Sequence, residues 1–285
     1  MTTSFGQGLT NAAVKEKVRK FYDIGSPLYL DVYGQHIHDG YYITGKESKE
    51  EAQENLIKLI VQKAGIKKGA KVLDVGCGVG GSSVWLAQNL GAATTGITIS
   101  PVQVEIAQKL ARKAGVSSIF TVMDAENMRF DEKFDVIWVV AAMTHFQQQE
   151  SFIKSASQYL NSKGKFIVFD WMSNEEVEDV LNDPYLKPVS EGMLLARLYS
   201  INQHLEWFIK YGYRLIYAED ITEHTLKTWS DALSVIKRPA VLKLAYGMAK
   251  EYRGEALHFL KSVGAMKRAM LKGKLKTGLI VAEKI

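Results

Sequence analysis

The sequence predicts an α/β protein with a doubly wound, mostly parallel sheet, helices on both faces and a helical cap. Three observations predict this class. Between residues 71 and 169, short apolar segments alternate with amphipathic ones at the spacing of parallel β–α–β units. A glycine-rich turn at 76–81 joins the first apolar segment directly to a helical one. The 285 residues, 47% of them hydrophobic, suffice for one large core.

Two amphipathic segments precede the alternating region. Residues 11–24 have helical spacing of apolar side chains, and we expect the Gly-Ser-Pro sequence at 25–27 to end that helix. Residues 28–45 are rich in tyrosine, glycine and histidine, so we expect an irregular loop there. A second amphipathic helix is predicted over 47–64.

The alternating region contains five predicted strands and three predicted helices. The strands are expected at 71–75, 92–97, 118–123, 134–140 and 165–169. The helices between them are expected at 80–90, 101–114 and 148–160. Pro101 suits a first helical turn, because no intrahelical hydrogen bond needs its missing N–H. The Asn-Ser-Lys-Gly sequence at 161–164 is predicted to be a turn.

The pattern changes after residue 171. Further elements are predicted as helices at 174–181 and 200–211, a strand at 213–219, a helical region at 222–271 broken near Pro239, and a closing strand at 276–284. We therefore predict a single domain, 1–285. Its expected parts are N-terminal helices at 11–64, a core at 65–171 and helical cap elements at 172–212 and 222–271.

Composition and charge argue against a secreted, disulfide-bonded or membrane-spanning protein. The single cysteine permits no internal disulfide, and residues 1–10 show no signal-peptide pattern, so we expect a cytoplasmic protein. No apolar run approaches the ~18 residues of a membrane span. Residues 237–276 hold eleven Lys or Arg against two acids. This stretch is either a solvated helix face or a contact with an anionic membrane or acidic acceptor, and it carries no nucleic-acid motif. The oligomeric state stays open.

The most informative segment is 72–81, VLDVGCGVGG. Glycines let the chain turn sharply and approach a ligand closely, and the following helix offers unpaired N–H groups. Gly76, Gly78 and Gly81 fit the G-x-G-x-x-G of dinucleotide sites. Gly80 in place of Gly81 instead completes the G-x-G-x-G of methyltransferases. The glycines alone leave both open.

Two further observations favour S-adenosylmethionine over a nicotinamide. Asp74 lies two residues before the first glycine, where it can hold the loop and meet the cationic end of methionine, but would repel a pyrophosphate. The second strand runs into Ile-Thr-Ile-Ser at 97–100, without the acid that a dinucleotide ribose requires. A nicotinamide-dependent reductase stays a remote alternative.

The turn after the second strand carries a more specific resemblance. Residues 96–103, GITISPVQ, resemble the tocopherol methyltransferase family and its sterol and cyclopropane-lipid relatives. The same family resembles this chain at FYD (21–23), GQHIHDGY (34–41), MDAE (123–126) and KTW (227–229). The resemblance implies a class I methyltransferase, with a Rossmann-like seven-stranded sheet and S-adenosylmethionine as cofactor.

The resemblance also implies roles for particular residues. Tyr22 and Tyr41 would line the channel of the transferable methyl group. The expected cofactor-binding residues are Tyr22, Asp74, Gly76, Cys77, Gly78 and Gly80, then Thr98, Ile99 and Gln103 for the ribose, and Asp124, Ala125 and Glu126 for the adenine. Cys77 is interpreted as a small structural residue of the loop, not as a nucleophile.

The chain departs from the family after the fourth strand. Tocopherol-group relatives carry acids at the positions of Ala141 and Thr144, whereas the histidine is retained as His145. Losing acids removes electrostatic stabilisation of a carbocation. We therefore expect methylation at nitrogen or oxygen of a small hydrophobic, natural-product-like acceptor from secondary metabolism. The alternative is C-methylation of an aromatic, prenyl or sterol-like acceptor.

Methyl transfer is an in-line displacement, so positioning of the nucleophile is the main task. His145 is the candidate base, against the alternative that it only hydrogen-bonds a neighbouring loop. His36 and His38 are further candidates, against the alternative of ordinary loop polarity. No metal site is predicted, because this pair lacks further ligands at metal spacing.

An acceptor pocket is expected over the carboxyl ends of the strands. Its candidate walls are Tyr22, Tyr29, Tyr41, Trp171, Met172, Met193, Leu194 and Tyr199. The alternative is that these side chains belong to the core.

Overall fold

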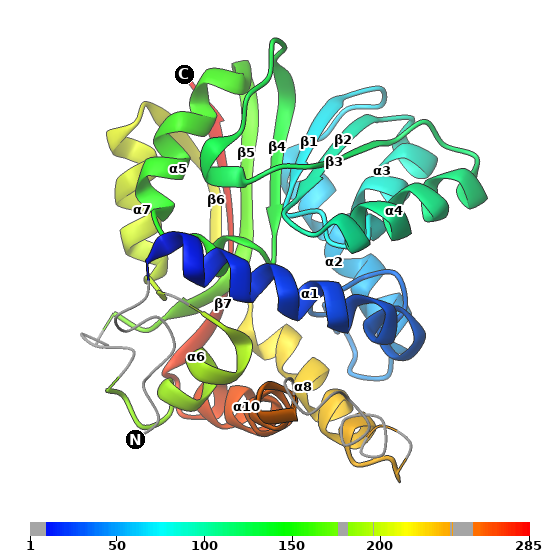
Figure 1. Ribbon diagram of the computed structural model, residues 1–285. Helices are drawn as coiled ribbons and strands as arrows, with labels where there is room; N and C mark the ends of the chain where they lie inside the picture. The colour runs from blue at the N-terminus through cyan, green and yellow to red at the C-terminus, as the bar shows by residue number, and fades with distance from the viewer. Residues whose placement is uncertain (1–9, 176–181, 196, 240, 242–252) are drawn as a thin grey trace.

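The computed structural model describes residues 10–175, 182–195, 197–239, 241 and 253–285. One seven-stranded sheet runs through the molecule in the order β3-β2-β1-β4-β5-β7-β6 (Figure 1). Its strands are β1 (Lys71–Val75), β2 (Ala93–Thr98), β3 (Ile119–Val122), β4 (Phe134–Val140), β5 (Leu160–Ser173), β6 (Tyr213–Asp220) and β7 (Leu275–Lys284).

The strand directions confirm the predicted fold class. β1 pairs in parallel with β2 and β4, which in turn pair in parallel with β3 and β5. Only β7 is antiparallel to its neighbours, β5 and β6. The strand order therefore reverses beside β1, and in such sheets ligands bind at the carboxyl ends of the strands near that switch point.

Helices cover both faces of the sheet because neighbouring strand residues point to opposite sides. On one face, Ile137 packs with side chains of α5 (Gln149–Ala156) and α7 (Ile201–Lys210). On the other face, Trp138 packs with side chains of α2 (Lys49–Ala64) and α3 (Gly81–Leu90). Further helical elements are α4 (Pro101–Ala114) and the 3₁₀ turns η1 (Ala125–Asn127), η2 (Met143–His145) and η3 (Ser157–Tyr159).

The cap has a core of its own below the carboxyl edge of the sheet (Figure 1). It contains α6 (Lys187–Met193), α8 (Thr222–Ile236) and α10 (Arg253–Leu271). Gly192 lets α6 approach α10, because a Cβ there would lie 2.3 Å from the Cβ of Ser262. The sequence did not predict α6, and most of the helix predicted at 174–181 falls outside the described residues. No helix among the described ranges has the length and apolar character required to cross a membrane.

The first helix differs most from its prediction. α1 runs from Asn11 to Tyr33 and contains Pro27, so the predicted end at 25–27 and the loop beginning at 28 are wrong. Proline removes one helical hydrogen bond. Contacts in the turn before the proline compensate, because Asp23 accepts a hydrogen bond from Ser100 Oγ at 2.5 Å and Ser26 accepts one from Gln103 Nε2 at 3.1 Å. Tertiary contacts thus override the local signal.

Other boundaries agree closely with the sequence. The strands predicted at 71–75 and 134–140 and the helix at 101–114 coincide with β1, β4 and α4. The predicted turn at 161–164 instead lies inside β5. There the pairing with β4 shifts register and Lys163 takes a left-handed φ of 60°, so the turn chemistry appears as a bulge.

The loop between α1 and α2 is held down by one side chain. Gln53 of α2 is buried and donates hydrogen bonds to the carbonyls of His36 and His38, at 2.6 and 3.1 Å. The loop lies so close to α3 that a Cβ on Gly81 would stand 2.0 Å from the Gln35 carbonyl oxygen. Gln53 therefore fixes the loop over the amino end of α3.

We predict that Gln53→Ala lowers the free energy of unfolding by ~1–3 kcal/mol, because two buried carbonyls lose their donor. Lys58→Ala on the same helix removes an exposed side chain and should change it by less than ~0.5 kcal/mol. Urea denaturation of both variants tests this. Equal effects would contradict the assigned role of Gln53.

Candidate functional site

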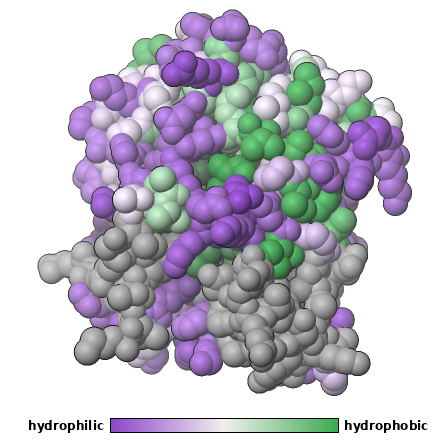
Figure 2. Space-filling view, viewed as in Figure 1, coloured by the Kyte–Doolittle hydropathy of each residue, from purple (hydrophilic) through white to green (hydrophobic). Residues whose placement is uncertain are grey.

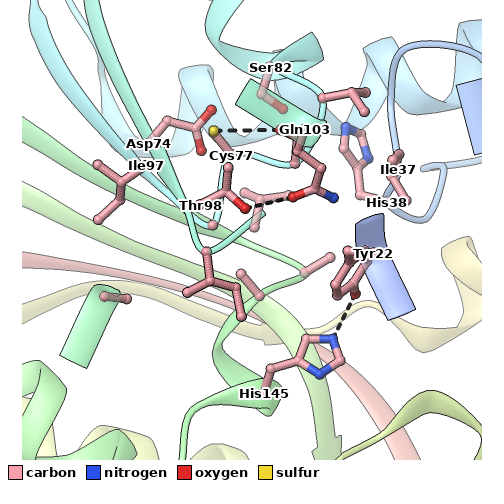
Figure 3. Close-up of a pocket in the computed structure, with 18 of the residues that line it drawn as sticks. Tyr22, Ile37, His38, Asp74, Cys77, Ser82, Ile97, Thr98, Gln103 and His145 are labelled. Carbon is pink, nitrogen blue, oxygen red and sulfur yellow. Dashed lines mark hydrogen bonds between the residues drawn. The ribbon is translucent and has the colours of Figure 1, made fainter. Parts of the chain in front are cut away.

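Two adjoining cavities open at the carboxyl ends of the parallel strands. The first, of about 970 Å³ with its open mouth, is lined by the glycine loop and the ends of β2, β3 and β4 (Figure 3). The second, of about 1440 Å³, is lined mainly by α1 and the cap. Both share the wall residues Tyr22, Ile37, His38, Ala141 and His145. These five residues mark the passage between them.

Helix α1 covers this edge of the sheet. In Figure 1 it crosses in front of the strand ends, and Figure 2 shows a hydrophilic band at the same place. Its inward side contributes Lys15 and Val18 to the first cavity and Tyr29 and Tyr33 to the second. Tyr22 lies between them and contributes to both. One helix therefore supplies a wall to each cavity.

The glycine loop forms the floor of the first cavity. Gly76 and Gly78 have positive φ angles of 74° and 54°, and a Cβ on Gly76 would stand 2.4 Å from that of Ala142. Asp74 is 2% exposed and accepts a hydrogen bond from Ser83 Oγ at 2.6 Å. Burial raises the pKa of Asp74 to about 7, although this hydrogen bond opposes the rise. Asp74 thus faces the cavity without an ion-pair partner among the described residues.

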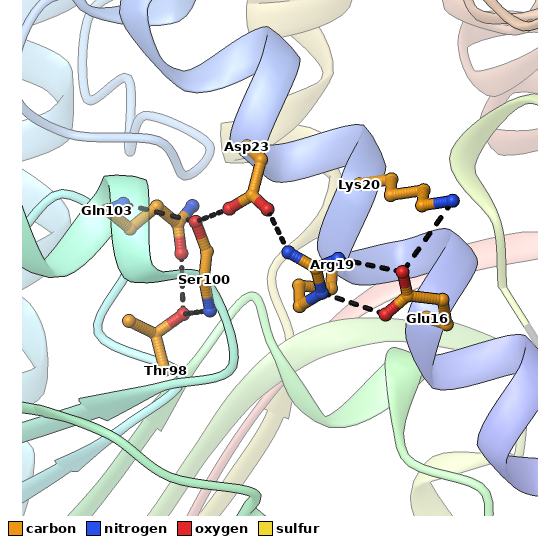
Figure 4. Close-up of polar contacts among 7 residues, drawn as sticks. All are labelled: Glu16, Arg19, Lys20, Asp23, Thr98, Ser100 and Gln103. Atoms are coloured by element: carbon orange, nitrogen blue, oxygen red, sulfur yellow. Dashed lines mark hydrogen bonds and ion pairs between the residues drawn. The ribbon is translucent and has the colours of Figure 1, made fainter.

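A chain of polar contacts lies at the end of β2 (Figure 4). The Thr98 hydroxyl donates to Gln103 Oε1 at 2.6 Å, and Gln103 Nε2 donates to Ser26 of α1. Ile99 also lines the first cavity. Thr98, Ile99 and Gln103 therefore lie together at the first cavity, and their role toward the ribose stays a prediction. Ser26 joins them, although no sequence motif indicated it.

A third polar group lies at the end of β3. Asp124, Ala125 and Glu126 line the first cavity, as predicted. Lys15 of α1 bridges the two acids, with its Nζ 2.7 Å from an oxygen of each. The sequence analysis missed Lys15, because a helix position does not reveal which strand end it will face.

Tyr22 and His145 meet at the passage between the cavities (Figure 3). The Tyr22 hydroxyl lies 2.8 Å from His145 Nε2, and His145 Nδ1 lies 3.3 Å from the Leu194 carbonyl. A carbonyl only accepts, so Nδ1 carries the proton and Nε2 accepts from Tyr22. Burial lowers the pKa of His145 to about 4, which leaves a neutral imidazole at the passage.

A buried acid, Asp170, lies near this pair: burial raises the pKa of Tyr22, and the charge of Asp170 raises it further. The sequence indicated only that acids are lost at Ala141 and Thr144. Asp170 at the end of β5 accepts hydrogen bonds from the Thr144 N–H at 3.1 Å and its hydroxyl at 3.0 Å. Burial raises the pKa of Asp170 to about 6. An acid contributed by β5 thus sits against the position where relatives were expected to carry one. Asp170 could have been predicted from the pairing of β4 with β5, which brings the two strand ends together.

Two predicted site residues lie elsewhere. Tyr41 lines neither cavity; its ring stacks on His224 of α8 with centroids 4.3 Å apart, and its N–H donates to Ala52 of α2. Gly80 also lies outside the lining, because it faces Ala107 and Phe120 behind the loop. For both residues the predicted place is corrected. Cys77 does line the first cavity, with a buried thiol whose pKa is raised by burial.

The predicted acceptor walls divide in the same way. Tyr22, Tyr29, Trp171 and Met193 line the second cavity. Met172, Leu194, Tyr199 and Tyr41 do not. Met172 packs in the main core, with Tyr199 against it, so here the core alternative was correct. His36 and His38 both line the first cavity, and His38 also lines the second.

Comparisons with known proteins agree with this geometry. Residues 10–254 match the mycolic acid cyclopropane synthetase family. Tocopherol O-methyltransferase of Arabidopsis thaliana is 28% identical, over 95% of this chain and 83% of its own length. The cyclase SpnF superposes with a TM-score of 0.82 at 25% identity, covering 95% of this chain and 96% of its own.

One similar structure contains a bound product of the expected cofactor. Mycolic acid cyclopropane synthase CmaA1, complexed with S-adenosylhomocysteine, superposes with a TM-score of 0.78 at 21% identity, covering 97% of this chain and 99% of its own. In the present chain, the glycine cradle, the uncompensated Asp74 and the polar end of β2 fit such a group, because it carries a cationic amine and ribose hydroxyls.

We predict that affinity for S-adenosylhomocysteine rises with pH up to about 7 and then levels off. Below that pH the Asp74 carboxyl is protonated in the free protein and must lose its proton to meet the ligand's ammonium group. Asp74→Asn should lower the affinity and abolish this pH dependence. Calorimetry across the pH range measures both, with NADPH as the competing ligand. A pH-independent wild type, or binding of NADPH instead, would show that the loop has been misinterpreted.

Proposed function

The chain belongs to the mycolic acid cyclopropane synthetase family and is an S-adenosylmethionine-dependent methyltransferase, and from this premise we propose that it methylates a nitrogen or oxygen of a small hydrophobic acceptor. The observation that carries this proposal is the pair of adjoining cavities that meet at Tyr22 and His145. One cavity is polar and fits the cofactor, and the other is apolar and fits the acceptor.

The first cavity has groups suited to each part of the cofactor. Asp74 would meet the methionine ammonium group, while Thr98 and Gln103 would hold the ribose. Asp124, with the Ala125 N–H, would meet the adenine. When bound there, S-adenosylmethionine supplies an activated methyl group on its sulfonium. The protein then has to deliver a nucleophile to the passage and keep water out.

Tyr22 and His145 are placed to orient that nucleophile. His145 is a neutral imidazole whose Nε2 lone pair accepts a hydrogen bond from the Tyr22 hydroxyl. The same lone pair can instead accept a hydrogen bond from the O–H or N–H of the methyl acceptor. Nδ1–H to the Leu194 carbonyl holds the ring in the required tautomer. The pair thus supports attack by a heteroatom whose proton must leave.

C-methylation is the alternative, and one contact favours it. Asp170 provides a buried carboxyl that accepts a hydrogen bond from Thr144, where relatives were expected to carry an acid, although Asp170 itself lines neither cavity. The family name itself refers to chemistry at carbon. The loss of acids at Ala141 and Thr144 is therefore weaker support for N- or O-methylation than the sequence suggests.

We also propose peripheral membrane contact through the basic stretch at 237–276. Lys237 and Arg238 are exposed and follow directly on Ile236, which lines the acceptor cavity. Basic residues beside an apolar opening suit an acceptor taken from an anionic lipid surface.

A turnover screen with methyl-labelled S-adenosylmethionine tests the proposed function. The acceptors are grouped as amines and indoles, phenols and quinols, and prenyl or sterol olefins. We expect label on nitrogen or oxygen. Label on carbon would establish the alternative, and consumption of an acceptor without any label would contradict methyl transfer.

Single substitutions at the passage test the roles of the pair. We expect His145→Asn and Tyr22→Phe to lower kcat by roughly 10²-fold, because the nucleophile loses its hydrogen-bond partner or its orientation. Tyr29→Phe removes a hydroxyl from the acceptor wall without touching His145 and should leave kcat within about threefold. Similar kcat values in all three variants would reject the assignment.

A further inference from the structure

One carboxyl group stands out in the wall of the acceptor cavity. Asp39, in the loop after α1, is 3% exposed and is the only carboxylic acid among the described residues that line this cavity. Its Oδ2 accepts a hydrogen bond from the Trp171 indole N–H at 2.9 Å. Its Oδ1 has no hydrogen-bond partner within the described ranges. One oxygen of this largely buried carboxyl group is thus left for a ligand in the cavity.

The rest of the wall is aromatic. Seven rings line the cavity together with Asp39: Phe21, Tyr22, Tyr29, Tyr33, Trp171, Trp229 and Phe259. Several of them meet edge to face, such as Tyr29 with Phe259 at 5.7 Å between centroids. The face of an aromatic ring carries negative potential and attracts cations. The Asp39 carboxylate and the faces of the aromatic rings therefore both attract a positively charged ligand.

No lysine or arginine among the described residues lines this cavity to oppose its negative character. His38 and His145 line it, but burial lowers the pKa of each to about 4 and leaves them neutral. Asp170 and tyrosines are the acidic groups near Asp39, and Lys49, whose Nζ lies 5.0 Å from the centroid of the Tyr33 ring, is outside the cavity lining.

Ionisation of the Asp39 carboxyl is costly in these surroundings. Burial raises the pKa of Asp39 to about 7, and the Trp171 hydrogen bond offsets only part of the rise. An ionised carboxylate without a partner in an apolar site is strongly disfavoured. A ligand that brings a positive charge, or a hydrogen to share, removes this penalty.

We propose that Asp39 and the aromatic wall recognise the acceptor as an alkylammonium cation, which makes the enzyme an amine N-methyltransferase. This rests on the proposed function and names its substrate class. The neighbouring His38 lines both cavities, so an amine held by Asp39 lies on the side that adjoins the passage.

Asp39 also has a place for the proton that must leave. As the ammonium N–H bond breaks, its electron pair stays on nitrogen and the proton passes to Asp39 Oδ1, giving a neutral amine and a neutral carboxylic acid. The nitrogen lone pair would then form the new N–C bond while the C–S bond breaks, with the C–S electron pair staying on sulfur as the neutral thioether. The methylated product is again a cation, which the rings hold.

Binding of two probes to the protein without cofactor tests the proposal. Octyltrimethylammonium carries a permanent cation, and 1-octanol has the same chain without charge. By calorimetry, the wild type should bind the cation at least about tenfold more tightly than the alcohol, or ~1.4 kcal/mol. Asp39→Asn keeps an oxygen for Trp171 and should remove this preference while leaving octanol affinity unchanged.

Controls separate this result from misfolding and from the proposed function. Asp131→Asn removes an exposed carboxyl at the opposite end of the sheet and should leave both affinities unchanged. S-adenosylhomocysteine binding reports that each variant is folded. Equal affinity for the two probes in the wild type, or an unchanged preference in Asp39→Asn, would overturn the assignment of Asp39. Loss of methyl transfer on every acceptor would instead overturn the proposed function.

Discussion

The two hydrogen bonds that tie α1 to the amino end of α4, directly after β2, are the contacts on which the site depends. Ser100 donates to Asp23, and Gln103 donates to Ser26, on either side of the turn that precedes Pro27. They hold a proline-containing helix across the strand ends. Without α1, both cavities would lose a wall and the passage would open to water. The same Gln103 faces the first cavity, so assembly of the cover and of the cofactor site share one side chain.

Burial favours the neutral form of each titratable group around the site. His38 and His145 have lowered pKa values, whereas Asp39, Asp74 and Asp170 have raised ones, and burial is the largest cause in every case. Removal from water disfavours the charged form of either kind of group. We therefore expect a charged ligand to stabilise the ionised forms of these groups, as water does for groups at a protein surface. A dry site of this kind strengthens each contact made to a bound cation.

Much of the fold could be predicted from sequence, because local pattern and tertiary structure agree. The strands β1 and β4 and the helix α4 have clean periodicity and clear end signals, and their bounds were correct. The glycine loop and the ends of β2 and β3 were also found, since each follows a strand directly. Residues brought in from elsewhere were missed: Lys15 from α1 and Asp170 from β5 reach the site only through packing and strand pairing. Tyr41 was misplaced because a motif says nothing about which way its loop turns.

The limited overlap between the two cavities bears on how this enzyme can diversify. Among the described residues, five line both cavities, and most of the acceptor wall comes from α1, α8 and α10, outside the strands that form the cofactor floor. Substitutions in those helices can reshape the acceptor cavity while the glycine loop stays intact. Descendants of such a chain can therefore exchange one substrate for another in single mutational steps, without passing through forms that have lost their methyl donor.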